Sequence, residues 1–147
     1  SERLSMNLGG GYLRTEYKDF ISSVGGDLSG NPMPGSPKVN LSVEFSYDLG
    51  DIKEWQVEAK VDYSYTDHRY FNAFKDEDVS SLGSHELIGA RLSSTSPNGK
   101  WNIALWGRNL TDEEYIVDST DLEGNFGFIS EFYGDRRSVG IDLSYTF

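Results

Sequence analysis

The sequence contains no cysteine, which excludes disulfide bonds, zinc–thiolate sites and a cysteine nucleophile. Long apolar runs are also missing. Hydrophobic residues make up 37% of the 147 residues, and no stretch approaches the roughly 18 uncharged apolar residues of a transmembrane helix. Basic residues are few, 13 against 24 acidic ones, and the resulting formal charge of −11 argues against nucleic acid as a partner. The length fits one domain or a piece of a larger one.

The sequence does contain segments in which apolar and polar residues alternate with a period of two. Side chains point to alternate faces of a β-strand, so each such segment has one apolar face and one polar face. The clearest apolar rows are Val39, Leu41, Val43, Phe45 and Tyr47, then Trp55, Val57, Ala59, Val61, Tyr63 and Tyr65, and a third row at the end of the chain. The rhythm predicts six strands, near residues 3–17, 37–48, 53–66, 84–95, 100–117 and 136–147. No segment shows a helical period.

The predicted connections alternate between long and short. Asp48–Asp51 and Ser96–Gly99 are predicted tight turns, because their Gly and Asn residues accept a positive φ. The links near 18–36, 67–83 and 118–135 are long and rich in Gly, Ser and Asp. An up-and-down antiparallel sheet then has its short turns at one end and its long loops at the other, as outer-membrane barrels do. We therefore predict an all-β fold with an antiparallel up-and-down sheet, an arrangement that transmembrane β-barrels share.

Acidic side chains are concentrated in and beside the predicted long loops, where the basic residues are Lys18, Arg69 and Lys75. The acidic residues are Asp19, Asp27, Asp67, Asp76, Glu77, Asp78, Asp112, Glu113, Glu114, Asp118, Asp121, Glu123, Glu131 and Asp135. Two interpretations stay open, ordinary solvated loops or the capture of a cation or ligand. Because like charges repel unless they are screened or bridged, we expect divalent cations or a cationic ligand to order the third loop.

The alternation alone leaves the direction of the apolar face open. It points inward in a soluble sandwich or lipocalin-like barrel and toward lipid in a membrane barrel. Strands of about 11 residues, tilted near 45°, cover the roughly 25 Å apolar band of a membrane. Aromatic residues at the predicted strand ends also resemble two interfacial girdles, with Tyr47, Trp55, Trp101, Tyr145 and Phe147 near the short turns and Tyr12, Tyr63 and Tyr65 near the long loops. These features favour the membrane interpretation.

The final residues strengthen it. The last strand carries an unbroken apolar row of Val139, Ile141, Leu143, Tyr145 and Phe147. This row resembles the terminal β-signal of outer-membrane proteins, which the barrel-assembly machinery reads. The resemblance implies that outer-membrane lipid and the assembly machinery are partners, and that the chain is an integral barrel segment in the outer membrane of a Gram-negative bacterium.

A more specific resemblance lies just upstream of this row. The segment Trp106–Tyr115, followed by Phe132–Arg137, resembles the C-terminal end of TonB-dependent outer-membrane receptors. In that family an Asn-Leu-(Thr/Phe)-Asp-x-x-Tyr segment precedes a loop that closes with Tyr-Gly-x-(Pro)-Arg. The residues that match this pattern are Asn109, Leu110, Asp112, Tyr115, Tyr133, Gly134 and Arg137. Arg136 departs from the usual proline or small residue. Leu28–Pro37 resembles the family's proline-containing link between strands.

The resemblance implies that residues 1–147 are the C-terminal portion of a barrel of about 22 strands, with the plug domain, the TonB box and the upstream strands absent. It further implies TonB-dependent uptake of a scarce nutrient, with a ferric siderophore or another iron chelate as the leading cargo and TonB acting through the plug.

Two other functions stay open. One is a small eight-stranded outer-membrane barrel for adhesion or protection, which would need further strands within 19–36 and 124–133. The other is a soluble lipocalin-like binding protein. No pattern indicates an enzyme, a cofactor or a metal site.

Overall fold

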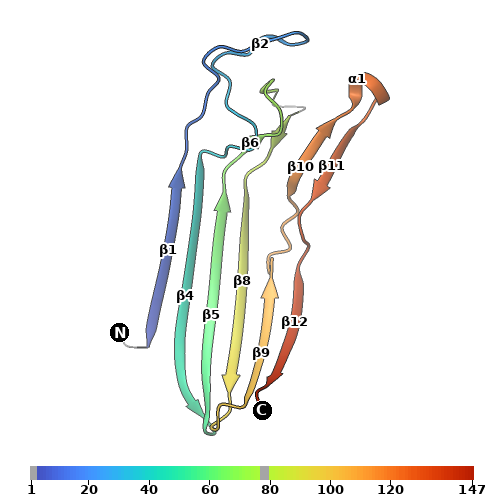
Figure 1. The fold of residues 1–147 in the computed structure, drawn as a ribbon. Helices are drawn as coiled ribbons and strands as arrows, with labels where there is room; N and C mark the ends of the chain where they lie inside the picture. Colours follow the sequence, from blue (N-terminus) through green and yellow to red (C-terminus); the bar gives the residue numbers. More distant parts are fainter. Residues whose placement is uncertain (1–2, 77–79) are drawn as a thin grey trace.

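The computed structural model describes residues 3–76 and 80–147, which form one tall antiparallel sheet with hairpins above one end (Figure 1). The six-stranded sheet has the order β1-β4-β5-β8-β9-β12, so consecutive long strands are neighbours. Its strands are β1 (Leu4–Tyr12), β4 (Val39–Ile52), β5 (Trp55–Thr66), β8 (His85–Thr95), β9 (Trp101–Arg108) and β12 (Ser138–Tyr145). The predicted all-β, up-and-down antiparallel architecture is confirmed.

Two strands end earlier than the sequence predicts. β9 stops at Arg108 rather than near residue 117, because Asn109 and Asp112 adopt positive φ angles of 47° and 58° that break the extended backbone. β1 stops at Tyr12 rather than near residue 17. Beyond it the chain still pairs irregularly with the returning arm of the first loop, through the amide of Tyr17 and the carbonyl of Asn31 at 2.9 Å.

The two short turns lie at the opposite end of the sheet from the hairpins (Figure 1). The turn at Ser96–Gly99 is confirmed: the Gly99 amide donates to the Ser96 carbonyl at 2.8 Å, and Gly99 has a φ of 70°. The turn predicted at Asp48–Asp51 is wrong. That segment is a β-bulge, with Gly50 at φ 77°, and the chain reverses further on at Lys53 and Glu54, whose φ angles are 51° and 69°.

The long connections contain small structures of their own. The first loop holds the hairpin β2 (Ile21–Ser22) and β3 (Gly26–Asp27), and the second pairs β6 (Arg69–Tyr70) with β7 (Ser81–Leu82). The third contains β10 (Ile116–Asp121), β11 (Ile129–Tyr133) and between them the four-residue helix α1 (Glu123–Phe126). Glu77 and Asp78, two of the acidic residues predicted to lie in the second loop, fall outside the described residues. No helix of the described chain has the length and apolar character to cross a membrane.

The apolar face of the sheet is largely uncovered in the described residues, and Val57, at 8% exposure, is its one buried large side chain among them. One apolar row crosses all six strands, through Leu4, Tyr47, Ala59, Leu92, Leu105 and Ile141. Large side chains on this face remain open, including Leu8 at 70% and Val139 at 73% exposure. Tyr47, predicted at the short-turn end, lies in this middle row because β4 continues to Ile52. A single layer with one bare apolar face is typical of a sheet whose apolar solvent is lipid.

The sheet is open rather than closed within the described residues. β1 and β12 are its outer strands, and each pairs on one side, with β4 and β9 respectively. The segments that the eight-stranded alternative would need form β2, β3 and β11, which pair in separate hairpins above the sheet. The described chain therefore does not form that closed barrel.

Candidate functional site

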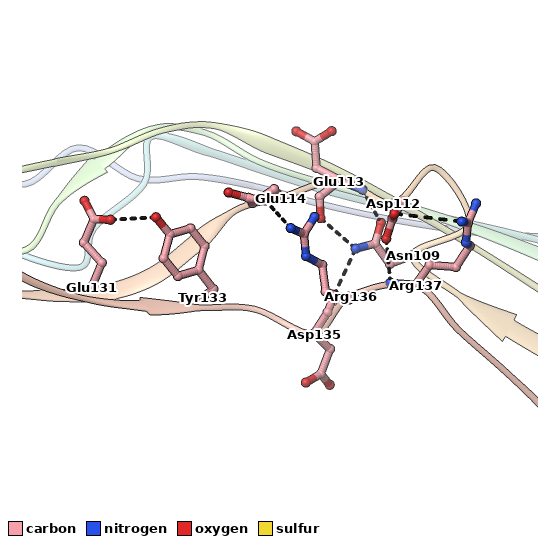
Figure 2. Close-up of polar contacts among 9 residues, drawn as sticks. All are labelled: Asn109, Asp112, Glu113, Glu114, Glu131, Tyr133, Asp135, Arg136 and Arg137. Carbon is pink, nitrogen blue, oxygen red and sulfur yellow. Dashed lines mark hydrogen bonds and ion pairs between the residues drawn. The ribbon is translucent and has the colours of Figure 1, made fainter.

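The third loop closes on the side chain of Asn109, which follows β9 and is only 5% exposed. Its amide nitrogen donates to the carbonyl of Glu113 at 2.8 Å and to the carbonyl of Asp135 at 2.9 Å, while its amide oxygen accepts from the Glu113 amide at 2.8 Å (Figure 2). Asparagine suits this position because it tolerates the left-handed backbone and can serve as donor and acceptor together. Both ends of the loop are thereby joined at one residue.

Two acidic–basic pairs flank Asn109, as Figure 2 shows. Asp112 accepts a hydrogen bond from the backbone amide of Arg137 at 3.1 Å, and its second oxygen lies 3.9 Å from the Arg137 guanidinium. Arg136 forms an ion pair with Glu114. All four side chains are more than 40% exposed, so the ion pairs contribute little and the bond to the backbone amide fixes the geometry.

Gly134 lies under the ring of Tyr115. A Cβ atom at Gly134 would approach the Tyr115 ring to 2.1 Å, and the Gly134 amide donates to the Tyr115 carbonyl at 2.9 Å. The Tyr115 ring also stacks on His85 of β8, with ring centres 4.4 Å apart. Position 134 therefore requires glycine, because any side chain there would collide with the Tyr115 ring that lies over the backbone.

The structure brings the predicted motif together at the base of the third loop. Asn109, Leu110, Asp112 and Tyr115 lie on the rising arm, and Tyr133, Gly134 and Arg137 lie on the returning arm. Tyr133 reaches away from Asn109 and donates from its hydroxyl to Glu131 at 2.7 Å (Figure 2). That hydrogen bond, together with the Glu131 charge, raises the pKa of Tyr133.

The predicted assembly row lies on the apolar face and runs from Val139, near this loop base, to the end of the chain. Its exposed fractions run from 39% to 104%, for Val139, Ile141, Leu143, Tyr145 and Phe147. The two sets meet at Gly107 of β9, where a Cβ atom would lie 2.5 Å from Leu110 and 3.5 Å from Val139. The recognition role of the row stays a prediction.

Sequence reasoning missed a polar cluster on the opposite face of the sheet. Arg91 pairs with Asp142 at 2.8 Å, Trp106 donates from its indole nitrogen to the same carboxylate at 3.0 Å, and the Arg108 guanidinium lies 5.3 Å from the Trp106 ring centre. A Cβ atom at Gly140 would approach that ring to 2.4 Å. The available signal was Trp106 in the polar phase of its strand, where a tryptophan needs both a small neighbour and a partner for its N–H.

The acidic residues of the third loop do not converge. Asp112 and Glu114 face Arg137 and Arg136, which follow the loop in sequence. Across residues 3–76 and 80–147, no group of three His, Asp or Glu side chains is arranged to hold a metal ion. The expectation that a divalent cation orders this loop therefore gains no support from its geometry.

No family model matches the sequence, and no curated protein matches it either. Among solved structures, the fold is similar to the crystal structure of the ferric yersiniabactin uptake receptor FyuA from Yersinia pestis, with a TM-score of 0.83 over 100% of this chain at 17% sequence identity. The chain has the fold of one part of that receptor. It covers 21% of that receptor's chain, about a fifth of its length. The match confirms, for the fold, the resemblance predicted from the sequence.

Proposed function

We propose that this chain is part of a TonB-dependent receptor in the outer membrane of a Gram-negative bacterium, which imports a scarce nutrient. The observation that carries the proposal is the difference between the two faces of the single sheet. One face is apolar and largely uncovered across the described strands, and on the other Arg91 and Trp106 both bind Asp142. In a membrane barrel the apolar face would contact lipid and the polar face would line the water-filled lumen, so each face would meet a solvent of matching polarity.

The free edges of the sheet support a larger barrel. Unpaired backbone groups on β1 and β12 would be costly in lipid, and additional strands on both sides would satisfy them. We propose that residues 1–147 form the C-terminal portion of a barrel of about 22 strands, and that a plug domain and the remaining strands belong to the same protein. The chain covers 21% of the similar receptor's chain, which is in keeping with its being one part of a larger protein.

The proposed partners follow from the surfaces. The apolar face contacts lipid, and the row from Val139 to Phe147 is the proposed segment for the barrel-assembly machinery. The loops at the hairpin end capture the cargo, which TonB moves inward through the plug. A ferric siderophore or other iron chelate is the proposed cargo, since the similar structure is a ferric yersiniabactin uptake receptor. This is a transport role, and we propose no enzymatic activity.

An uptake assay tests this function. Cells with and without the gene would be starved of iron, and accumulation of radioactive iron from a panel of ferric chelates would be measured. We expect uptake of at least one chelate that disappears when the gene or the TonB energy supply is removed. Membrane fractionation is the companion measurement. Recovery of the protein in the soluble fraction without detergent, or uptake that continues when TonB is removed, would contradict the proposal.

A further inference from the structure

Alternation of side chains determines which face of β12 is apolar, but it leaves more than one register of β12 against β9 open. A slip of one residue would exchange the two faces and is therefore excluded. A slip of two residues keeps every apolar side chain on the apolar face and every polar one on the polar face. A further feature is therefore needed to select the observed register, in which Gly140 lies opposite Trp106 and Asp142 lies opposite Ala104.

The ring of Trp106 fits the backbone of β12 at one position. It lies against Gly140, where a Cβ atom would come within 2.4 Å of the ring. The guanidinium of Arg108, two residues along the same strand, lies 5.3 Å from the ring centre and favours this position of the aromatic face. Any other residue in place of Gly140 would displace the ring. The observed position of Trp106 therefore requires glycine opposite it.

A carboxylate two residues further along β12 completes the fit. The indole nitrogen of Trp106 donates to Oδ1 of Asp142 at 3.0 Å, and Nη1 of Arg91 donates to Oδ2 of the same side chain at 2.8 Å. Ala104 of β9, opposite Asp142, is fully buried, and its small side chain leaves room for this contact. Arg91 and Asp142 are 40% and 51% exposed, so their ion pair contributes little energy. Most of the discrimination therefore comes from the Trp106 ring and its N–H.

A slip of two residues in either direction would lose both contacts. In one direction Asp142 would lie opposite Trp106, and in the other direction Ser138 would take that place. The ring would then collide with a side chain where it now lies against glycine. In neither case would a carboxylate lie opposite Ala104 to accept the indole N–H. The polar face thus distinguishes between registers that the apolar face treats alike.

We propose that Trp106, assisted by Arg91, selects the register of β12 by recognising Gly140 and Asp142. The apolar row of β12 determines the face of the strand, and this polar pair determines its position along β9. Because β12 is an outer strand of the sheet, its register also sets where its free backbone groups lie for a further strand. The inference rests on contacts among β8, β9 and β12 and does not depend on the proposed transport function.

Disulfide trapping in the complete protein measures the register directly. Residues 1–147 contain no cysteine, and any cysteine elsewhere in the protein would be replaced by serine. Leu105→Cys would be combined with Ile141→Cys, its partner in the observed register, or with Leu143→Cys, its partner after a slip of two. Opposite Cα atoms lie about 4.5–5.5 Å apart and can be bridged, whereas diagonal ones lie about 7–8 Å apart and cannot without backbone movement. All three positions lie on the apolar face, away from the contacts under test.

The decisive variant, Gly140→Ser/Asp142→Gly/Ser144→Asp, moves the recognised pair two residues along β12. All samples, the reference included, carry Asn109→Ala, which releases the base of the third loop. We expect the shifted variant to raise the ratio of slipped to native cross-link at least about tenfold. Adding Trp106→Leu should abolish that rise, because the ring that requires glycine is gone. A folded shifted variant that keeps the native cross-link would overturn the proposal, as would a rise that persists without Trp106.

Folded yield provides a second measurement that does not depend on the shifted variant. Folded protein resists unfolding in cold detergent, and cross-links are counted in that fraction alone. Gly140→Ala should lower the folded yield at least about threefold, and Gly140→Ala/Trp106→Leu should recover it. Gly11→Ala is the control, because a Cβ atom there meets nothing within 4 Å. Equal yields for Gly140→Ala and Gly11→Ala would overturn the proposal, and so would a yield that stays low after the ring is removed.

Discussion

The side-chain amide of Asn109 donates a hydrogen bond to the backbone carbonyl of Asp135, 26 residues further along the chain, at 2.9 Å. This contact ties the first residue after β9 to the segment that leads into β12. The intervening residues form the β10/β11 hairpin, which pairs within itself. One buried amide thus sets where the third loop leaves the sheet and where it returns.

Asn109→Ala should open the base of the third loop. The substitution removes three hydrogen bonds and leaves a β-carbon residue without a polar side chain at φ 47°. We expect a loss of about 2 kcal/mol in local stability, seen as roughly thirtyfold faster hydrogen exchange at the amide of Glu113. Asn109→Gly keeps a residue suited to the backbone and should cost about 1 kcal/mol less. Wild-type exchange at Glu113 in the alanine variant would show that the amide does not hold the loop.

Gly134→Ala should displace Tyr115. The new methyl group would lie 2.1 Å from the ring, so the ring must move and its stacking on His85 is disturbed. We expect a cost of about 1–3 kcal/mol and faster proteolysis within residues 109–137. Gly124→Ala, in the same loop, is the control because a Cβ atom there meets nothing within 4 Å. Equal cleavage rates for the two variants would rule out the packing explanation.

Leu92→Lys and Ser93→Lys should differ sharply, although the residues are adjacent. Leu92 lies on the apolar face between Ala59 and Leu105, and Ser93 lies on the polar face opposite Glu58. A lysine facing the middle of a bilayer costs about 2–4 kcal/mol, whereas position 93 offers a carboxylate neighbour. Folding of the complete protein into lipid vesicles would measure the difference. If both variants fold equally well, the apolar face does not meet lipid.

Tyr133 should ionise above the ordinary range of tyrosine. Its hydrogen bond to Glu131 and the charge of that carboxylate favour the neutral phenol, and so raise its pKa. The contact therefore stabilises the loop below the ordinary tyrosine pKa, about 10, and is lost as pH rises through the raised value. The difference in absorbance titration between wild type and Tyr133→Phe would isolate this residue. Glu131→Gln should move its midpoint downward, and an unchanged midpoint would contradict the assignment.

The alternation of side chains was sufficient to predict all six long strands, because it reflects a property of each strand by itself. The local turn residues, by contrast, placed one turn wrongly. Gly50 signalled a positive φ, which serves a bulge as well as a turn. The true turn uses Lys53 and Glu54, residues with no preference for that conformation. It is therefore set by the pairing of β4 with β5 rather than by local chemistry.

The sequence by itself determined the strand pattern and the alternation of short turns with long loops, because each depends on residues close together in the chain. Tertiary structure alone decided which distant groups meet. The amide of Asn109 finds Asp135 because β9 and β12 are neighbours in the sheet. Likewise Arg91 of β8 reaches Asp142 of β12, 51 residues further along the chain, because only β9 lies between the two strands in the sheet.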